Sequence, residues 1–132
     1  DAVHFLGFVP LQQLLGLYRR AAALAYVSYG GPENLPPLEA FALGCPVVAA
    51  DIPGAREQLG DAALLVDPGS PEALAAALAR VIGDRNLAAD LRSRGRKRAG
   101  ERTATAFVRG MLSWLDRFAV VRAAWPSPPP PI

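Results

Sequence analysis

Short apolar runs alternate with helical periodicities over the first two thirds of this 132-residue chain. The runs are continuous rather than alternating, as in strands that are buried on both faces. A strand–helix order this regular predicts a parallel sheet with helices on both faces, the doubly wound α/β class. Strands are expected at residues 3–9, 23–29, 46–50 and 63–66.

The intervening segments predict helices that begin and end at recognisable signals. Ser70, Pro71 and an acidic third residue are a typical helix start, and Gly44 is a suitable residue to end a helix. Trp114 and Trp125 fall in the last helix, where they either pack into the core or cover a surface that another lobe would occupy. Helices are expected at residues 11–20, 36–43, 55–59, 71–82, 86–98 and 103–125.

The length fits one domain, which we expect over residues 1–125, followed by an extended Pro-rich tail at 126–132. The chain opens at Asp1 and its single methionine is Met111, so we expect it to be part of a longer protein. No uncharged run is long enough for a membrane span, which predicts a soluble, cytoplasmic protein. One cysteine and one histidine cannot build a metal cage or an internal disulfide, and we expect no cofactor.

The net charge of +2 conceals a strong asymmetry. Residues 1–91 carry five arginines against ten acidic residues, whereas residues 92–132 carry nine basic residues against two acidic ones. A cation cluster, defined as Arg92, Arg94, Arg96, Lys97 and Arg98, accounts for much of the difference. It is either a solvated helix face turned to the acidic body of the chain or to an absent lobe, or a contact for anionic membrane lipids that would make the protein peripheral to the inner membrane. Nucleic acid is disfavoured because no aromatic residues interleave the cations.

Ligands of parallel α/β sheets bind beyond the carboxyl ends of the strands. The loop and helix start at residues 28–39 offer glycines, an amide, an acid and free helix N–H groups at such an end, which suits a diphosphate. Pro36 and Pro37 lack N–H groups, so the amides of Asn34, Leu35 and Leu38 remain as donors. The chain has neither GxxxxGK[ST] nor GxGxxG, which disfavours mononucleotide kinases and dinucleotide dehydrogenases.

Glu39 lies about one turn into the helix that follows this loop, between apolar residues. A carboxylate there needs hydrogen-bond donors, and the two hydroxyls of a ribose would supply them. The alternative is a structural Glu that accepts bonds from nearby backbone N–H groups.

Several other polar residues favour structural roles. Cys45 is expected to be a buried thiol, and His4 a packed or capped residue within a strand rather than a catalytic base. Asp51 is expected to close a turn through backbone N–H groups, and Arg56 to be a solvated surface residue. A triad of Ser28, His4 and Asp51 is disfavoured because no G-x-S-x-G elbow surrounds the serine.

Three stretches of the chain resemble the family 4 glycosyltransferases, which have the GT-B fold. The longest is PENLPPLEAFALGCPVVAAD at residues 32–51, and the others are GDAALLVDP at 60–68 and FLGFV at 5–9. They occur in the family's order and at its separations, and the resemblance covers roughly residues 1–100. It implies that the chain is most of the C-terminal, nucleotide-sugar-binding lobe, without its first βα units.

The resemblance also implies roles for individual residues. Glu39 matches the second Glu of the family's E-x7-E motif, which binds the donor ribose. The first Glu of that motif corresponds to Gly31, where this sequence departs from the family, and Glu33 is a candidate to reach the sugar or act in catalysis instead. The remaining implied contacts are Asn34, Leu35 and Pro36 at the diphosphate and Gly7, Phe8 and Val9 at the nucleobase.

The implied activity is transfer of a sugar from a nucleotide-diphosphate donor to an acceptor hydroxyl, with retention and without an obligate metal. The acceptor would come from an N-terminal lobe, and an Arg and a Lys from earlier βα units would neutralise the diphosphate. The 132-residue chain alone is therefore expected to be inactive. A non-catalytic nucleotide or nucleotide-sugar binding module is the alternative hypothesis, and an Arg-rich nucleic-acid scaffold is a third.

Overall fold

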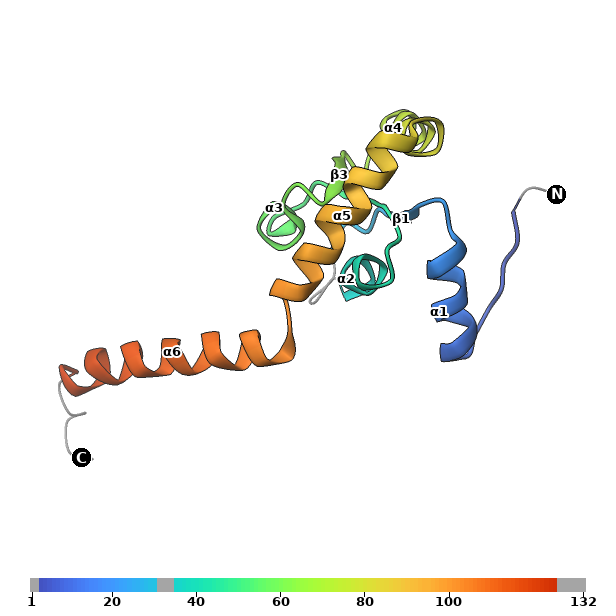
Figure 1. Cartoon of the computed structure of the whole chain (residues 1–132). Helices are drawn as coiled ribbons and strands as arrows, with labels where there is room; N and C mark the ends of the chain where they lie inside the picture. The colour runs from blue at the N-terminus through green and yellow to red at the C-terminus, as the bar shows by residue number, and fades with distance from the viewer. Residues whose placement is uncertain (1–2, 31–34, 126–132) are drawn as a thin grey trace. The chain divides into compact units, whose positions relative to one another are not determined.

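The computed structural model describes residues 3–30 and 35–125, which form two compact units, residues 1–100 and 101–132. The first unit contains a three-stranded parallel sheet of β1 (Leu24–Tyr26), β2 (Val47–Ala50) and β3 (Ala63–Val66), in that order. Leu24 pairs with Val47, and Val47 with Ala63. The expected parallel, doubly wound class is confirmed (Figure 1).

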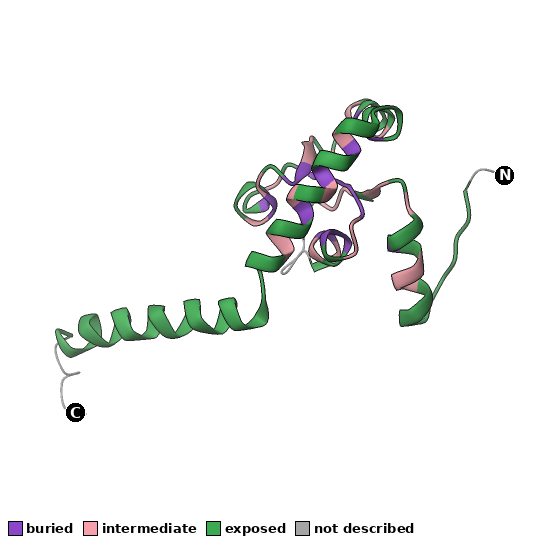
Figure 2. Cartoon of the chain, viewed as in Figure 1, coloured by how far each residue is buried: buried purple, intermediate pink, exposed green. Residues whose placement is uncertain are grey.

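Helices cover both faces of this sheet, and β2 is therefore buried on both sides. Val47 and Ala49 face one core cluster, which they share with residues of α1 (Leu11–Arg20), α2 (Leu35–Ala42) and α3 (Ala55–Leu59). Val48 faces the other cluster, which holds residues of α4 (Pro71–Gly83) and α5 (Arg85–Glu101). Buried residues are concentrated around the sheet (Figure 2). A continuous apolar strand therefore serves two cores.

Helix α5 reaches from one cluster to residues that lie just before the strands. Its first half contributes Ala88 and Leu91 to the cluster around Val48. Its second half contacts Phe41 of α2 through Gly95, and its arginines reach Asp61 and the end of α3. The segments just before β2 and β3 mark the amino edge of a parallel sheet, so the second half of α5 lies at the edge opposite the one where ligands bind.

Local signals set most element boundaries as expected. The Ser70 hydroxyl accepts a hydrogen bond from the Ala73 N–H at 3.2 Å, with Pro71 at the first helical position. Helix α2 ends at Ala42, and Gly44 then adopts a left-handed φ of +73°. The bounds of α3 and β3 agree with the sequence prediction.

The strand expected at residues 3–9 is wrong: the structure has no strand in this described segment. Phe5 and Phe8 are 97% and 93% exposed, and His4 is exposed as well rather than packed or capped within a strand. A strand needs a neighbour for its N–H and C=O groups, and β1 pairs in the described sheet with β2 alone. Gly7, at φ +60°, also interrupts the extended backbone.

The second unit consists, in its described part, of α6 (Ala104–Ala123) and its flanking residues. Thr103 caps the helix by accepting a hydrogen bond from the Ala106 N–H at 3.1 Å. None of the twenty residues of α6 is buried, and Trp114 and Trp125 are 72% and 66% exposed. The two tryptophans therefore do not pack into a core, which was one of the two expectations for them. The expected Pro-rich tail at 126–132 lies outside the described residues.

Candidate functional site

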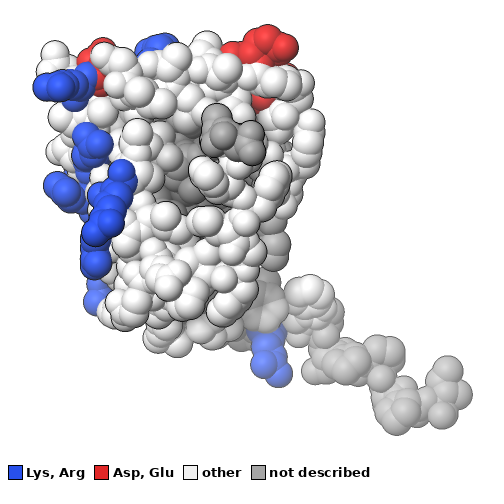
Figure 3. Space-filling view, turned by 90° about the vertical axis from the view of Figure 1, so that its right-hand side faces the viewer, with Lys and Arg blue, Asp and Glu red and all other residues white. Residues whose placement is uncertain are grey.

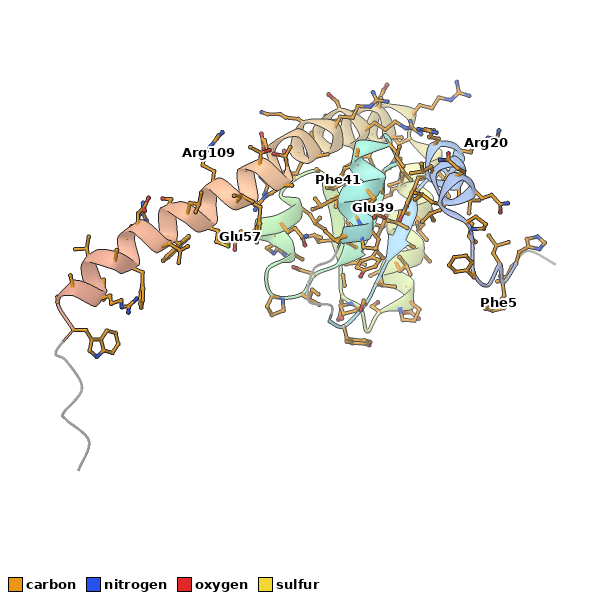
Figure 4. The ribbon with its side chains drawn as sticks, turned by 90° about the horizontal axis from the view of Figure 1, so that it is seen from below. Phe5, Arg20, Glu39, Phe41, Glu57 and Arg109 are labelled. Carbon is orange, nitrogen blue, oxygen red and sulfur yellow. The ribbon has the colours of Figure 1, made fainter. Side chains whose placement is uncertain are left out.

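Helix α2 begins at Leu35, after the carboxyl end of β1, and positions Glu39 one turn further along. Ala40 and Phe41 are buried and fix the helix against the sheet, whereas the Glu39 residue is exposed. The amphipathic arrangement therefore presents a carboxylate to solvent from a firmly packed helix. Figure 4 labels Glu39 and Phe41 on α2.

The Tyr18 hydroxyl of α1 donates a hydrogen bond to Oε2 of Glu39 at 3.2 Å. Tyr18 is only 8% exposed and belongs to the core cluster of Phe41 and Cys45. Burial, followed by the neighbouring negative charge of Glu39, raises the pKa of Tyr18 to about 12, so the phenol stays protonated near neutral pH. The hydrogen bond recorded for Glu39 in the described part of the chain thus comes from a side chain and not from the backbone N–H groups of the structural alternative.

Tyr18 was missed as a site residue because its spacing placed it in the apolar stripe of the helix at 11–20. One signal could have found it: a tyrosine in an apolar stripe needs a polar partner for its hydroxyl when it is buried.

Of the residues expected to contact the diphosphate, only some lie in the described start of α2. Leu35 and Pro36 are the first two residues of the helix, and Leu35 is 49% exposed. Gly31, Glu33 and Asn34, named in the sequence analysis as contacts for the sugar or diphosphate, lie outside the described residues.

The first unit has two hollows among its described residues. A cavity of about 10 Å³, room for about one water molecule, lies at the carboxyl ends of β1 and β2 and is lined by Ser28 and Ile52 among others. A groove of about 520 Å³ lies between α1 and the preceding segment and is lined by Phe8, Val9 and Leu17 among others. The groove has the size of a small-molecule site.

Only two of the three expected nucleobase contacts therefore line a hollow of the structure. Phe8 and Val9 line the groove, whereas Gly7 is not among the residues that line it.

Asp51 differs from its expected role. Its carboxylate accepts a hydrogen bond from Arg56 Nε at 3.1 Å and forms an ion pair with the same guanidinium; within the described part of the chain its bonds come from this side chain and not from backbone N–H groups. The Arg56 side chain is 77% exposed, which confirms its surface position.

The contacts of Ser28 do not form a triad, because its hydroxyl donates to the Gly30 carbonyl at 2.6 Å. Cys45 is 1% exposed, as expected for a buried thiol, and burial raises its pKa.

Two members of the cation cluster bind other residues of the first unit, to which they themselves belong. Arg94 donates to the Asp61 carbonyl at 2.9 Å and pairs with Asp90, and Arg98 donates to the Gln58 carbonyl at 2.9 Å and to that of Glu57. Arg98 therefore satisfies carbonyls at the end of α3. Figure 3 shows basic side chains gathered along one margin of the face it views.

Two searches of the described residues gave negative results. Within residues 3–30 and 35–125, no group of three His, Cys, Asp or Glu side chains could hold a metal ion. Among the helices of that same part, none is long and apolar enough to cross a membrane.

The parallel sheet, its two helical layers and an exposed acid one turn into the helix that follows β1 define a Rossmann-like α/β lobe. Sucrose-phosphate synthase from Thermosynechococcus elongatus has a similar structure, which assigns this lobe to the GT-B class: the TM-score is 0.72 at 31% identity over 89% of this chain and 30% of that one. Residues 1–98 match the family described as glycosyl transferases group 1, and the chain belongs to this family.

Curated relatives agree with this family. O-antigen chain mannosyltransferase B of Escherichia coli is 35% identical over 82 residues, which are 62% of this chain and 22% of that protein. D-inositol 3-phosphate glycosyltransferase of Salinispora arenicola is 36% identical over 114 residues, which are 85% of this chain and 25% of that protein. The chain thus spans about a quarter of the length of these relatives.

Proposed function

We propose that this chain is the donor-binding part of a retaining glycosyltransferase that takes its sugar from a nucleotide-diphosphate donor. Family membership favours this hypothesis over a non-catalytic binding module or a nucleic-acid scaffold. Glu39 carries the proposal, since it is an exposed carboxylate on a packed helix at the edge where such sheets bind ligands.

In this proposal the Glu39 carboxylate accepts hydrogen bonds from the ribose hydroxyls. An ionised carboxylate has about four acceptor sites, of which the Tyr18 hydroxyl uses one. The rest can serve the two vicinal hydroxyls of a ribose, and a bond to a charged acceptor is stronger than a neutral one.

The diphosphate would lie at the start of α2, near Leu35 and Pro36. Backbone N–H groups and the positive end of the helix dipole favour an anion there. As the glycosidic bond to the donor breaks, negative charge develops on the departing diphosphate, and fixed donors at this position stabilise it. We propose that the base borders Gly7, Phe8 and Val9, two of which line the 520 Å³ groove. We also propose that the sugar is transferred with retention of its anomeric configuration and without a metal ion.

The acceptor hydroxyl would come from a second lobe, which we propose to be the partner of α6. The apolar side chains Phe107, Met111, Trp114, Phe118 and Val121 follow one another at intervals of three and four residues. This spacing places them along one side of α6, where they are at least 47% exposed. An exposed apolar stripe of this length fits a protein surface that covers it.

Contact of the cation cluster with an anionic membrane stays a prediction. Arg94 and Arg98 are engaged with the first unit, whereas Arg96 and Lys97 are exposed. Vesicles containing anionic lipid, with and without an Arg96→Gln/Lys97→Gln double substitution, would test this contact.

The proposed donor site can be tested by calorimetry with UDP, GDP and ADP after a thermal-shift screen. Glu39→Gln should weaken binding of the preferred nucleoside diphosphate by about 1–3 kcal/mol, because a bond to a charged acceptor is lost. Glu72→Gln, which removes an exposed carboxylate from α4, is the charge-matched control and should leave affinity unchanged. Equal affinity of wild type and Glu39→Gln would leave Glu39 with a structural role only.

A further inference from the structure

The hydrogen bond between Tyr18 and Glu39 joins a buried side chain to an exposed one. Tyr18 is anchored in the core beside Phe41 and Cys45, and its hydroxyl reaches Oε2 of Glu39 at 3.2 Å. The two residues lie 21 positions apart and belong to different helices. The contact therefore fixes a solvent-facing carboxylate from the protein interior.

A phenylalanine would fill the core position of Tyr18 equally well, so packing alone does not explain the hydroxyl. A buried tyrosine hydroxyl needs a partner, and a backbone carbonyl would satisfy it. Here the partner is instead the acid to which we assign the ribose. The raised pKa of Tyr18 keeps this hydroxyl a donor at neutral pH.

Such a bond acts on a long, flexible side chain. A free glutamate samples several rotamers, and a ligand that needs one of them must bear the entropic cost of selecting it. A donor that already holds one carboxylate oxygen reduces this cost before the ligand arrives. It also determines which acceptor sites stay open to solvent.

We propose that Tyr18 is a positioning residue for the donor ribose, which holds the Glu39 carboxylate so that its open acceptor sites face both ribose hydroxyls. The inference rests on the proposed function and extends it, because it assigns part of the ribose selectivity to a side chain of α1 that acts through Glu39. Substrate selection at Glu39 is then coupled to the packing of α1.

The test compares each of UDP, GDP and ADP with its 2′-deoxy counterpart by calorimetry on the full 132-residue chain. The ratio of the two affinities is the readout, because a general loss of stability changes both affinities alike. The variants are Tyr18→Phe, Glu39→Gln and the double substitution. Ser70→Ala is the control, since it removes the hydroxyl cap of α4 and lowers stability without touching Glu39.

We expect wild type and Ser70→Ala to prefer the ribonucleotide. Tyr18→Phe should reduce this preference by about three- to tenfold, the fold-change of one hydrogen bond, while affinity for the 2′-deoxy compound, which keeps only the 3′-hydroxyl, falls less than affinity for the ribonucleotide. Glu39→Gln should abolish the preference, and adding Tyr18→Phe to it should cause no further loss.

Three results would overturn the inference, and they show whether the proposed function fails with it. If wild type and Tyr18→Phe show the same preference while Glu39→Gln loses it, Tyr18 has no positioning role and the proposed function stands. A stronger preference in Tyr18→Phe leads to the same conclusion, because the hydroxyl then competes with ribose. If wild type shows no preference at all, the ribose assignment of Glu39 fails together with the inference.

Discussion

Gly95 of α5 packs closely against Phe41 of α2, and this contact predicts a large effect of a very small substitution. A Cβ atom at Gly95 would lie 2.8 Å from Phe41 Cδ1 and 3.2 Å from its Cγ. Phe41 is 1% exposed and cannot move into solvent. Gly95→Ala should therefore force α5 and α2 apart.

Two effects of opposite sign set the magnitude. Overpacking of a dense core costs about 1–3 kcal/mol. Alanine in place of a helical glycine recovers roughly 1 kcal/mol. The first effect wins because the obstructing atoms belong to a buried ring, and the net loss is up to about 2 kcal/mol. It corresponds to a fall in Tm of up to about 15 °C for a unit of this size.

Thermal and urea unfolding of four variants would measure this effect: Gly95→Ala, Gly100→Ala, Phe41→Leu and the Phe41→Leu/Gly95→Ala double substitution. Gly100→Ala is the matched control, because it lies in the same helix and its added Cβ has nothing within 4 Å. It should be as stable as wild type or more so. Phe41→Leu combined with Gly95→Ala should cost less than the sum of the single changes. If Gly95→Ala proves as stable as Gly100→Ala, the two helices do not pack as described.

Three further predictions concern single side chains. Arg98→Met should lower the free energy of unfolding in urea by about 1–2 kcal/mol, because two carbonyls at the end of α3 lose a charged donor. The control Lys97→Met should change it by less than about 0.5 kcal/mol. Equal effects of the two substitutions would contradict the capping role of Arg98. The pKa of Tyr18 is raised from 10.0 to about 12, so its stabilising effect is complete below pH 10 and is lost as pH rises through 12. The loss should reach about 2–3 kcal/mol in wild type and disappear in Tyr18→Phe, and a pH dependence common to both would refute it. Because burial raises the pKa of Cys45, alkylation of the native chain should be slow, should speed up as pH rises and should reach the rate of a free thiol only in denaturant; a fast native rate would place the thiol at the surface.

The periodicity and cap signals predicted the elements of the first unit well wherever the residues of a segment alone determine its burial pattern or its ends. The continuous run at Val47–Ala50 predicted a strand buried on both sides, and Ser70 predicted the start of α4. The run at residues 3–9 failed because strand formation depends on a paired neighbour, which the run itself cannot reveal. Composition favours strand there, but the described sheet gives that segment no partner.

For the site, the sequence predicted Glu39 on its helix but not what would bind to it. Tyr18 lies 21 residues away, and a helical stripe shows which residues face inward without showing which residue they meet. For the same reason, the sequence did not show which groups Arg94 and Arg98 bind. Their spacing predicted a basic cluster, whereas their bonds to carbonyls near Asp61 and Gln58 depend on how α5 crosses the sheet edge.

The most direct measurement is a crystal structure of this chain, or of a longer natural form, with the nucleoside diphosphate that shifts its Tm most. The ribose hydroxyls should lie within hydrogen-bond distance of the Glu39 carboxylate, with Tyr18 still bonded to Oε2 and the diphosphate at the start of α2. A nucleotide bound with its ribose away from Glu39, or with its phosphates at another edge of the sheet, would contradict the proposed donor site.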